Sequence, residues 1–111
     1  MGKFTEVDVI ADFTTREVAL KVAETLIDDV TAFIVESLKD NDEKDFYLNI
    51  TDVDVDDTSI NIKLNSGRTA NADWQSEMIL KTLKEKHINE LDSFNAERVV
   101  PESFIYYERE D

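Results

Sequence analysis

Several residue types are scarce in this 111-residue chain, and each scarcity removes a class of function. Without cysteine there is no thiol nucleophile, no disulfide and no thiolate metal ligand, which is compatible with a reducing cytosol. Two glycines cannot build the loops that bring backbone N–H groups against a phosphate. No apolar run approaches the roughly 18 residues of a membrane span, and residues 1–10 lack the apolar region of a secretion signal. We therefore expect a soluble, cytoplasmic protein without a cofactor.

Positive charge is also scarce. The chain has 26 acidic and 12 basic residues, so its net charge is −14. Such a surface repels the phosphates of nucleic acids and anionic membranes, and it attracts basic partners. We expect a basic protein partner, with no direct binding to nucleic acid or membrane.

Apolar residues make up 41% of the chain, which is enough for one hydrophobic core at this length. With one proline, two glycines and no repeat or linker, most of the chain should lie in helices and strands. The prediction is a single acidic domain over residues 1–111.

The N-terminal third has two clear signals. Residues 4–13, FTEVDVIADF, alternate apolar and polar side chains, which is typical of a half-buried strand. Thr14 and Glu17 then have the spacing of a capping box, which predicts a helix start. Apolar residues at spacings of three and four continue to about Lys39, so one long amphipathic helix is expected.

The remaining elements follow from the same periodicities. Residues 46–55 alternate as a second strand, with a change of parity at Val53 that indicates a bulge. A turn at Asp56–Asp57 leads to a third strand over residues 59–65, so these two strands should form a hairpin.

A second helix is predicted over about residues 70–91 and a last strand over residues 103–108, SFIYYE. The order β-α-β-β-α-β is that of the ferredoxin-like α+β fold, in which two helices pack on one face of a four-stranded antiparallel sheet. The first and third strands should be central, and the second and fourth should form the edges. Many unrelated functions share this fold, so function must be argued from a site.

Aspartates at every second position raise the possibility of a metal site in TDVDVDD, residues 51–57. An EF-hand loop that starts at Asp52 needs glycine at its sixth position and glutamate at its twelfth, where this chain has Asp57 and Lys63. The flanks also alternate like strands and not like helices. A solvated strand edge is the favoured interpretation. The alternative is a cation-binding domain or a small metal-dependent enzyme that uses these hairpin-end aspartates.

Catalysis has little support. The single histidine, His87, lies on the apolar stripe of the second helix, where a structural role is favoured. Adjacent acids are too common here to mark an acid–base pair. RNA recognition on the open sheet face is also not expected, because Glu6, Asp8 and Asp12 lie where stacking aromatics are needed. We expect no enzyme activity.

The charge has a plain interpretation as a solubilising surface and a sharper one as a phosphate mimic. In composition the chain resembles small acidic phage proteins that block restriction or CRISPR enzymes, and acidic immunity proteins that cap nuclease toxins. The favoured function is therefore a non-enzymatic inhibitor that occupies the basic nucleic-acid-binding surface of an enzyme.

The predicted topology collects acids at two ends of the molecule. One end holds the hairpin tip, Asp12, the start of the first helix and the loop with Asp92, Glu97 and Glu102. The other end holds Asp40, Asp42, Glu43 and Asp45 together with the C-terminal residues 108–111.

Two apolar features of the predicted helices are further candidates for partner binding. The C-terminal turns of the first helix should overhang the sheet with Val35 and Leu38 on them, and this overhang could seat a partner or a second copy of the chain as a homodimer. Trp74 and Met78 lie nearly opposite the main stripe of the second helix, either as an exposed patch or as an edge packed internally. The candidate partner-binding residues combine acids from both ends with these two apolar residues: Asp12, Asp40, Asp42, Glu43, Asp45, Asp52, Asp54, Asp56, Asp57, Trp74 and Met78.

Overall fold

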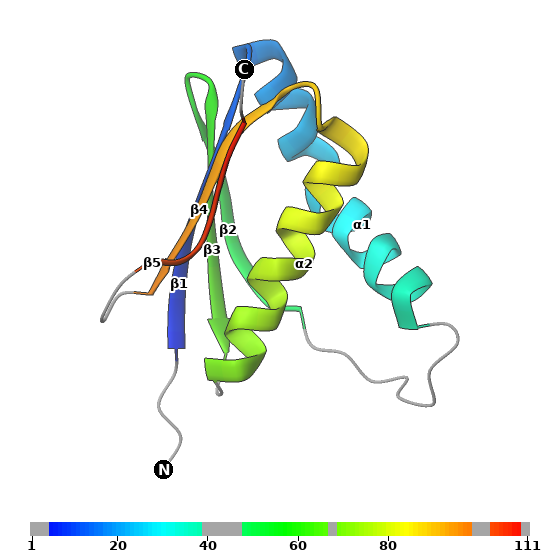
Figure 1. Ribbon diagram of the computed structural model, residues 1–111, viewed down its shortest axis with the longest axis vertical. Coiled ribbons are helices and arrows are strands. Elements are labelled where there is room, and N and C mark those ends of the chain that lie inside the picture. Colours follow the sequence, from blue (N-terminus) through cyan, green and yellow to red (C-terminus); the bar gives the residue numbers. More distant parts are fainter. Residues whose placement is uncertain (1–4, 39–47, 67–68, 99–102, 110–111) are drawn as a thin grey trace.

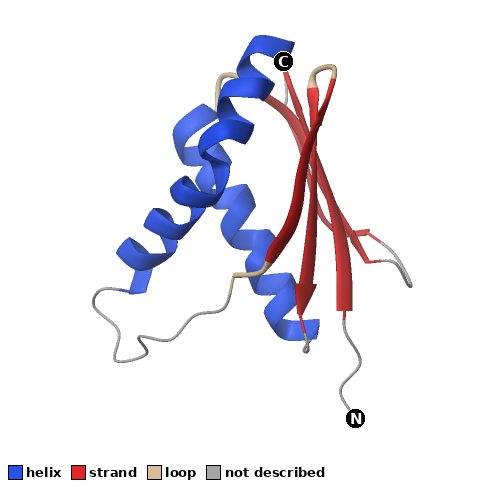
Figure 2. Cartoon of the chain, turned by 180° about the vertical axis from the view of Figure 1, so that it is seen from behind, coloured by secondary structure: helices blue, strands red, loops and turns tan. Residues whose placement is uncertain are grey.

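The computed structural model describes residues 5–38, 48–66, 69–98 and 103–109. They form a five-stranded antiparallel sheet with two helices packed on one face (Figures 1 and 2). In chain order the elements are β1 (Thr5–Phe13), α1 (Arg16–Leu38), β2 (Ile50–Asp56), β3 (Ser59–Ser66), α2 (Thr69–His87), β4 (Leu91–Arg98) and β5 (Ser103–Glu108).

The sheet confirms the predicted ferredoxin-like fold. Its strand order is β2-β3-β1-β4-β5, so β3 lies between β1 and β2, and β1 lies between β3 and β4. Each helix therefore connects two strands that have a third strand between them, which defines the split βαβ arrangement. As predicted, β1 and β3 are central and β2 is an edge strand.

The strand count differs from the prediction. Residues 91–98 form β4, which pairs with β1, and the predicted last strand is the added strand β5. As a result β4 is interior and β5 is the edge strand. The predicted second helix also ends earlier, at His87, because residues 88–90 form a turn closed by a hydrogen bond from the Glu90 N–H to the His87 carbonyl.

One face of the sheet and one stripe of each helix form the core. Every second residue of β1, from Val7 to Phe13, is buried beneath the helices. The buried residues of α1 recur at three- and four-residue intervals: Ala19, Val22, Leu26, Val30 and Ile34. Apolar residues from β3, α2 and β4 complete this core.

The start of α1 lies one residue beyond the predicted cap. The Thr15 hydroxyl accepts the Val18 N–H at 3.2 Å, so Thr15 caps the helix in place of Thr14. The Thr14 N–H is used elsewhere, because it donates to the Glu90 carbonyl and ties this corner to the turn before β4.

The hairpin confirms the predicted bulge. The register passes from Ile50 opposite Leu64 to Asp52 opposite Lys63, which leaves Thr51 as the extra residue. The Thr51 hydroxyl donates to the Lys63 carbonyl at 3.2 Å. At the tip, Asp57 has a φ of 56°, a left-handed conformation that aspartate tolerates better than most residues.

The first helix extends away from the sheet. The 23 described residues of α1 span about 34 Å, whereas the nine residues of β1 span about 30 Å. In Figures 1 and 2, α1 begins beside the hairpin end of the sheet and diverges from it toward Leu38. Near this end Val35 is exposed, as predicted, whereas Leu38 is half-buried and packs against the core.

Candidate partner-binding face

The helices cover one face of the sheet and leave the other open (Figure 2). Alternation along β1 directs Val7, Val9 and Ala11 to the helices, so the residues between them lie on the open face. Residues that are paired in antiparallel strands lie side by side on one face. The register therefore arranges the open face in three rows that run across the strands.

We name these rows by their distance from the tip of the β2–β3 hairpin. The tip row is Asp56, Ser59, Asp12, Ser93 and Glu108. The middle row is Asp54, Asn61, Ile10, Asn95 and Tyr106. The far row is Asp52, Lys63, Asp8 and Glu97.

The charge on this face is strongly one-sided. With Glu6, which precedes the far row on β1, eight described carboxylates lie on the open face: Glu6, Asp8, Asp12, Asp52, Asp54, Asp56, Glu97 and Glu108. Among the described side chains of these strands, Lys63 is the one cation on the face. Such a surface attracts cations over distances of about a Debye length, roughly 10 Å at 0.1 M salt.

The tip row alternates carboxylates with hydroxyls. The Asp12 carboxylate accepts hydrogen bonds from Ser59 on β3 and, at 2.9 Å, from Ser93 on β4. Serine on the intervening strands keeps the carboxylates of this row about 10 Å apart, which is two strand spacings and limits their mutual repulsion. Asp12 is thereby fixed in position from both sides.

The middle row has exposed apolar surface at its centre and at one end. Ile10, on the central strand β1, is 42% exposed, and Tyr106, on the edge strand β5, is 65% exposed. The Tyr106 hydroxyl donates to Glu108 at 2.9 Å. This hydrogen bond is the main cause that raises the pKa of the Tyr106 phenol above its ordinary 10.0.

The open face brings together four of the predicted partner-binding acids, Asp12, Asp52, Asp54 and Asp56. Asp57 is exposed in the turn beside them. The predicted acids Asp40, Asp42, Glu43 and Asp45 lie outside the described residues, as does Glu102 in the predicted loop.

The predicted two-pole distribution is wrong in two respects. Glu97 lies in the far row and not at the hairpin end, because residues 91–98 form a strand antiparallel to β1. Glu108 lies at the hairpin end and not at the opposite pole, because β5 reverses the chain once more. Arg109 fixes this end by donating to the Asn89 carbonyl and the Asp92 carboxylate.

Trp74 and Met78 pack internally, which is one of the two alternatives that the sequence left open. Met78 is only 8% exposed and belongs to the core, and Trp74 is half-buried against it. The exposed apolar patch that was the other alternative is therefore not present at these two residues.

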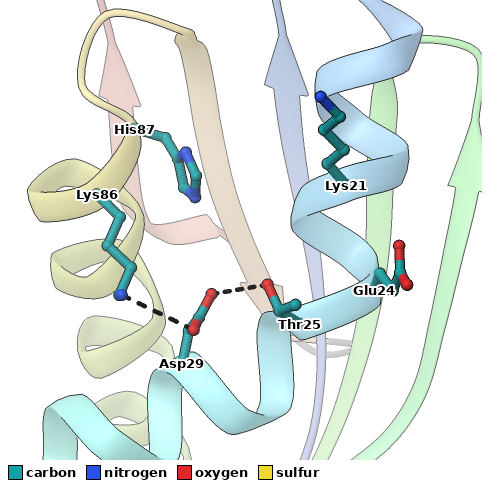
Figure 3. A pocket seen from close by; sticks show the side chains of 6 residues that line it. All are labelled: Lys21, Glu24, Thr25, Asp29, Lys86 and His87. Carbon is teal, nitrogen blue, oxygen red and sulfur yellow. Dashed lines mark hydrogen bonds and ion pairs between the residues drawn. The ribbon is translucent and has the colours of Figure 1, made fainter.

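A groove of about 560 Å³ lies between the helices (Figure 3). Its lining mixes both signs of charge: Lys21, Glu24, Thr25, Asp29, Lys86 and His87. Asp29 accepts a hydrogen bond from Thr25 at 2.8 Å and pairs with Lys86 at 3.8 Å, so much of this charge is neutralised internally. His87 faces the groove, with its Nδ1 3.7 Å from Glu90 Oε1. Sequence reasoning missed the groove, because it depends on how the two helices cross.

A metal centre at the hairpin end has no geometric support. Within the described ranges, no group of three or more His, Cys, Asp or Glu side chains could hold a metal ion. Asp52, Asp54 and Asp56 follow one another along an extended strand at intervals of about 7 Å, whereas calcium ligands lie about 2.4 Å from one shared ion.

Comparisons with known proteins add one structural likeness. No family model and no curated protein matches this chain. A dimeric ferredoxin-like protein from an uncultured marine organism is similar in structure, with a TM-score of 0.42 and 15% sequence identity over 100% of this chain and 95% of that chain. The fold assignment rests on the strand order described above. Neither helix, in the ranges that the structure describes, is both long and apolar enough to cross a membrane.

Proposed function

We propose that this chain is a non-enzymatic binding protein whose acidic open face occupies a basic surface of a partner protein. The observation that carries the proposal is the concentration of eight carboxylates and one ammonium group on a single uncovered face. A partner with clustered lysine and arginine gains long-range attraction to this face, and the main class of protein with such clusters binds nucleic acid.

The spacing of the rows supports phosphate mimicry. Asp12 in the tip row and Asp8 in the far row are four residues apart on β1, which corresponds to about 14 Å. The major groove of B-DNA is about 12 Å wide. Two parallel lines of carboxylates at a similar separation can satisfy a basic surface built for DNA.

In this proposal the chain is a cytoplasmic inhibitor of a nucleic-acid-processing enzyme, of the kind that phages direct against restriction or CRISPR enzymes or that protects against a nuclease toxin. Any homodimer would use the diverging end of α1 around Val35, because two acidic faces repel one another.

The decisive variant removes three charges from the acidic face. Asp52, Asp54 and Asp56 are changed together to Asn, and binding is followed by stopped flow with a partner captured from host lysate and purified. We expect the association rate to fall by about tenfold or more at low salt, because electrostatic steering acts mainly on that rate. The wild-type rate should fall steeply with added salt, and the partner should release bound DNA or RNA when the chain binds.

A matched control removes the same charge from the helical layer on the other side of the sheet. Glu24→Gln and Asp28→Asn on α1, together with Glu85→Gln on α2, replace three exposed carboxylates and change the net charge equally, but they leave the open face intact. Equal association rates for the two triple variants, or a flat salt dependence of the wild type, would contradict the proposal.

A further inference from the structure

The middle row separates two acidic rows with surface that is largely uncharged. We propose that this row binds a basic α-helix of the partner, which lies across the strands. The apolar side chains of that helix pack against Ile10 and Tyr106, and its Lys or Arg residues on both flanks face the two acidic rows. The inference rests on the proposed function and specifies the element of the partner that is bound.

The apolar contacts come first. Tyr106 is the most exposed large hydrophobic residue in the described part of the chain, and Ile10 is exposed at the centre of the acidic face. Asn61 and Asn95 lie on either side of Ile10, and their amide groups can both donate and accept hydrogen bonds. An apolar centre with a charged rim is the usual arrangement of a protein-binding surface, and aromatic residues are enriched among those that dominate binding energy.

The dimensions fit one helix. The tip row and the far row are about 14 Å apart, and a helix with its side chains is about 10–12 Å in diameter. The middle row from Asn61 to Tyr106 crosses three strand spacings, about 14 Å, which corresponds to about nine helical residues. A helix of two to three turns therefore covers the row and reaches carboxylates on both sides.

The two flanks differ in charge. In the tip row, carboxylates are separated only by serine hydroxyls, whereas in the far row Lys63 lies between Asp52 and Asp8. Carboxylates about 10 Å apart in the tip row match two helical turns, about 10.8 Å. We therefore expect basic residues at seven-residue intervals on the flank that faces the tip row, and fewer on the other flank.

The test uses two synthetic peptides of identical composition. The first is an amphipathic helix of Leu, Lys and Ala with lysines on both flanks of a leucine stripe, and the second has the same residues scrambled. We expect the helical peptide to bind at least tenfold tighter by calorimetry at physiological salt. The changes in amide chemical shift on peptide binding, measured by NMR, should centre on Ile10, Asn61 and Asn95.

Variants of the apolar contacts should affect one peptide only. Ile10→Thr and Tyr106→Ser should each weaken the helical peptide about tenfold and leave the scrambled peptide unchanged, whereas Tyr106→Phe should retain binding. Ile27→Thr on α1 is the matched control, since this isoleucine is also exposed but lies away from the face. If Ile10→Thr disturbs folding, Tyr106→Ser on the edge strand decides the question.

The outcomes separate this inference from the proposed function. If both peptides bind equally but lose affinity in the Asp52, Asp54 and Asp56 variant, the helix is wrong and the acidic binding face stands. If neither peptide responds to either set of substitutions, both are wrong. Amide shifts centred on the exposed stripe of α1 around Ile27 would likewise overturn the helix site.

Discussion

The two faces of the sheet come from the same strands, yet they have opposite composition. Val9 on β1 is 1% exposed beneath the helices, and its neighbour Ile10 lies in the middle of the acidic face. Alternation thus separates residues that stabilise the fold from residues that are free to bind. Asp8 and Glu97 show the consequence most directly: two carboxylates are directly opposite in the register, an arrangement that lowers stability. A surface selected only for stability would avoid this pair.

The largest effect on the free energy of unfolding is expected from a substitution on the covered face. Phe94 on β4 is fully buried, so Phe94→Ala should lower the free energy of unfolding by about 3–5 kcal/mol, because it removes buried apolar area and leaves a cavity. Denaturant unfolding measures the loss. Asn95→Ala, at the next position on the open face, is the control and should change stability much less. Similar losses from the two variants would break the distinction between the faces.

A smaller effect of opposite sign is expected on the open face. Glu97→Gln removes the repulsion with Asp8, so it should raise the free energy of unfolding by about 0.2–1 kcal/mol. The same change should slow association with a basic partner, because it removes charge from the far row. Unfolding and stopped-flow measurements on one variant test both effects. A loss of stability would mean that Glu97 has a structural role that outweighs repulsion.

The smallest effect concerns the phenol of Tyr106. Glu108→Gln should lower the pKa of this phenol toward 10.0, because the hydrogen bond to Glu108 is the main cause of its elevation. The raised pKa favours the protonated phenol in the folded state, so its contribution to stability is complete below pH 10 and is lost as the pH rises through the raised value. Ultraviolet titration of tyrosinate gives the pKa, and Tyr106→Phe identifies the step. If Glu108→Gln leaves the pKa of the Tyr106 phenol unchanged, the hydrogen bond to Glu108 is not the cause of the raised pKa.

Sequence periodicity was sufficient for the strands and helices with strong patterns. The alternation of β1, the long stripe of α1 and the parity change at Val53 are all visible in the sequence because the residues concerned have one buried side. The strand β4 was not visible. Leu91 continues the helical spacing of α2, and the Asp, Ser, Asn and Glu residues that follow it are poor strand formers. Pairing with β1 and β5 determines this strand, and that is information from distant residues.

The candidate site was predictable to the same extent. Asp12, Asp52, Asp54 and Asp56 were identifiable as acids on the polar side of predicted strands, since they alternate with apolar residues. Their grouping with Glu97 and Glu108, and the position of Tyr106 in the same row as Ile10, depend on the register and on the direction of β5. In the predicted four-stranded sheet, residues 103–108 would run in the direction opposite to that of β5.

The bulge at Thr51 has a consequence for how the protein behaves at high concentration. β2 is the last strand on its side of the sheet, and an edge strand of this kind can template the addition of a strand from another molecule, which is a route to aggregates. Three aspartates on β2 repel the same aspartates of an incoming copy of the strand, and the bulge interrupts the regular edge. The carboxylates that we propose for binding therefore also protect the edge of the sheet from aggregation. Their removal would leave an edge strand in which Val53 and Val55 alternate with neutral residues.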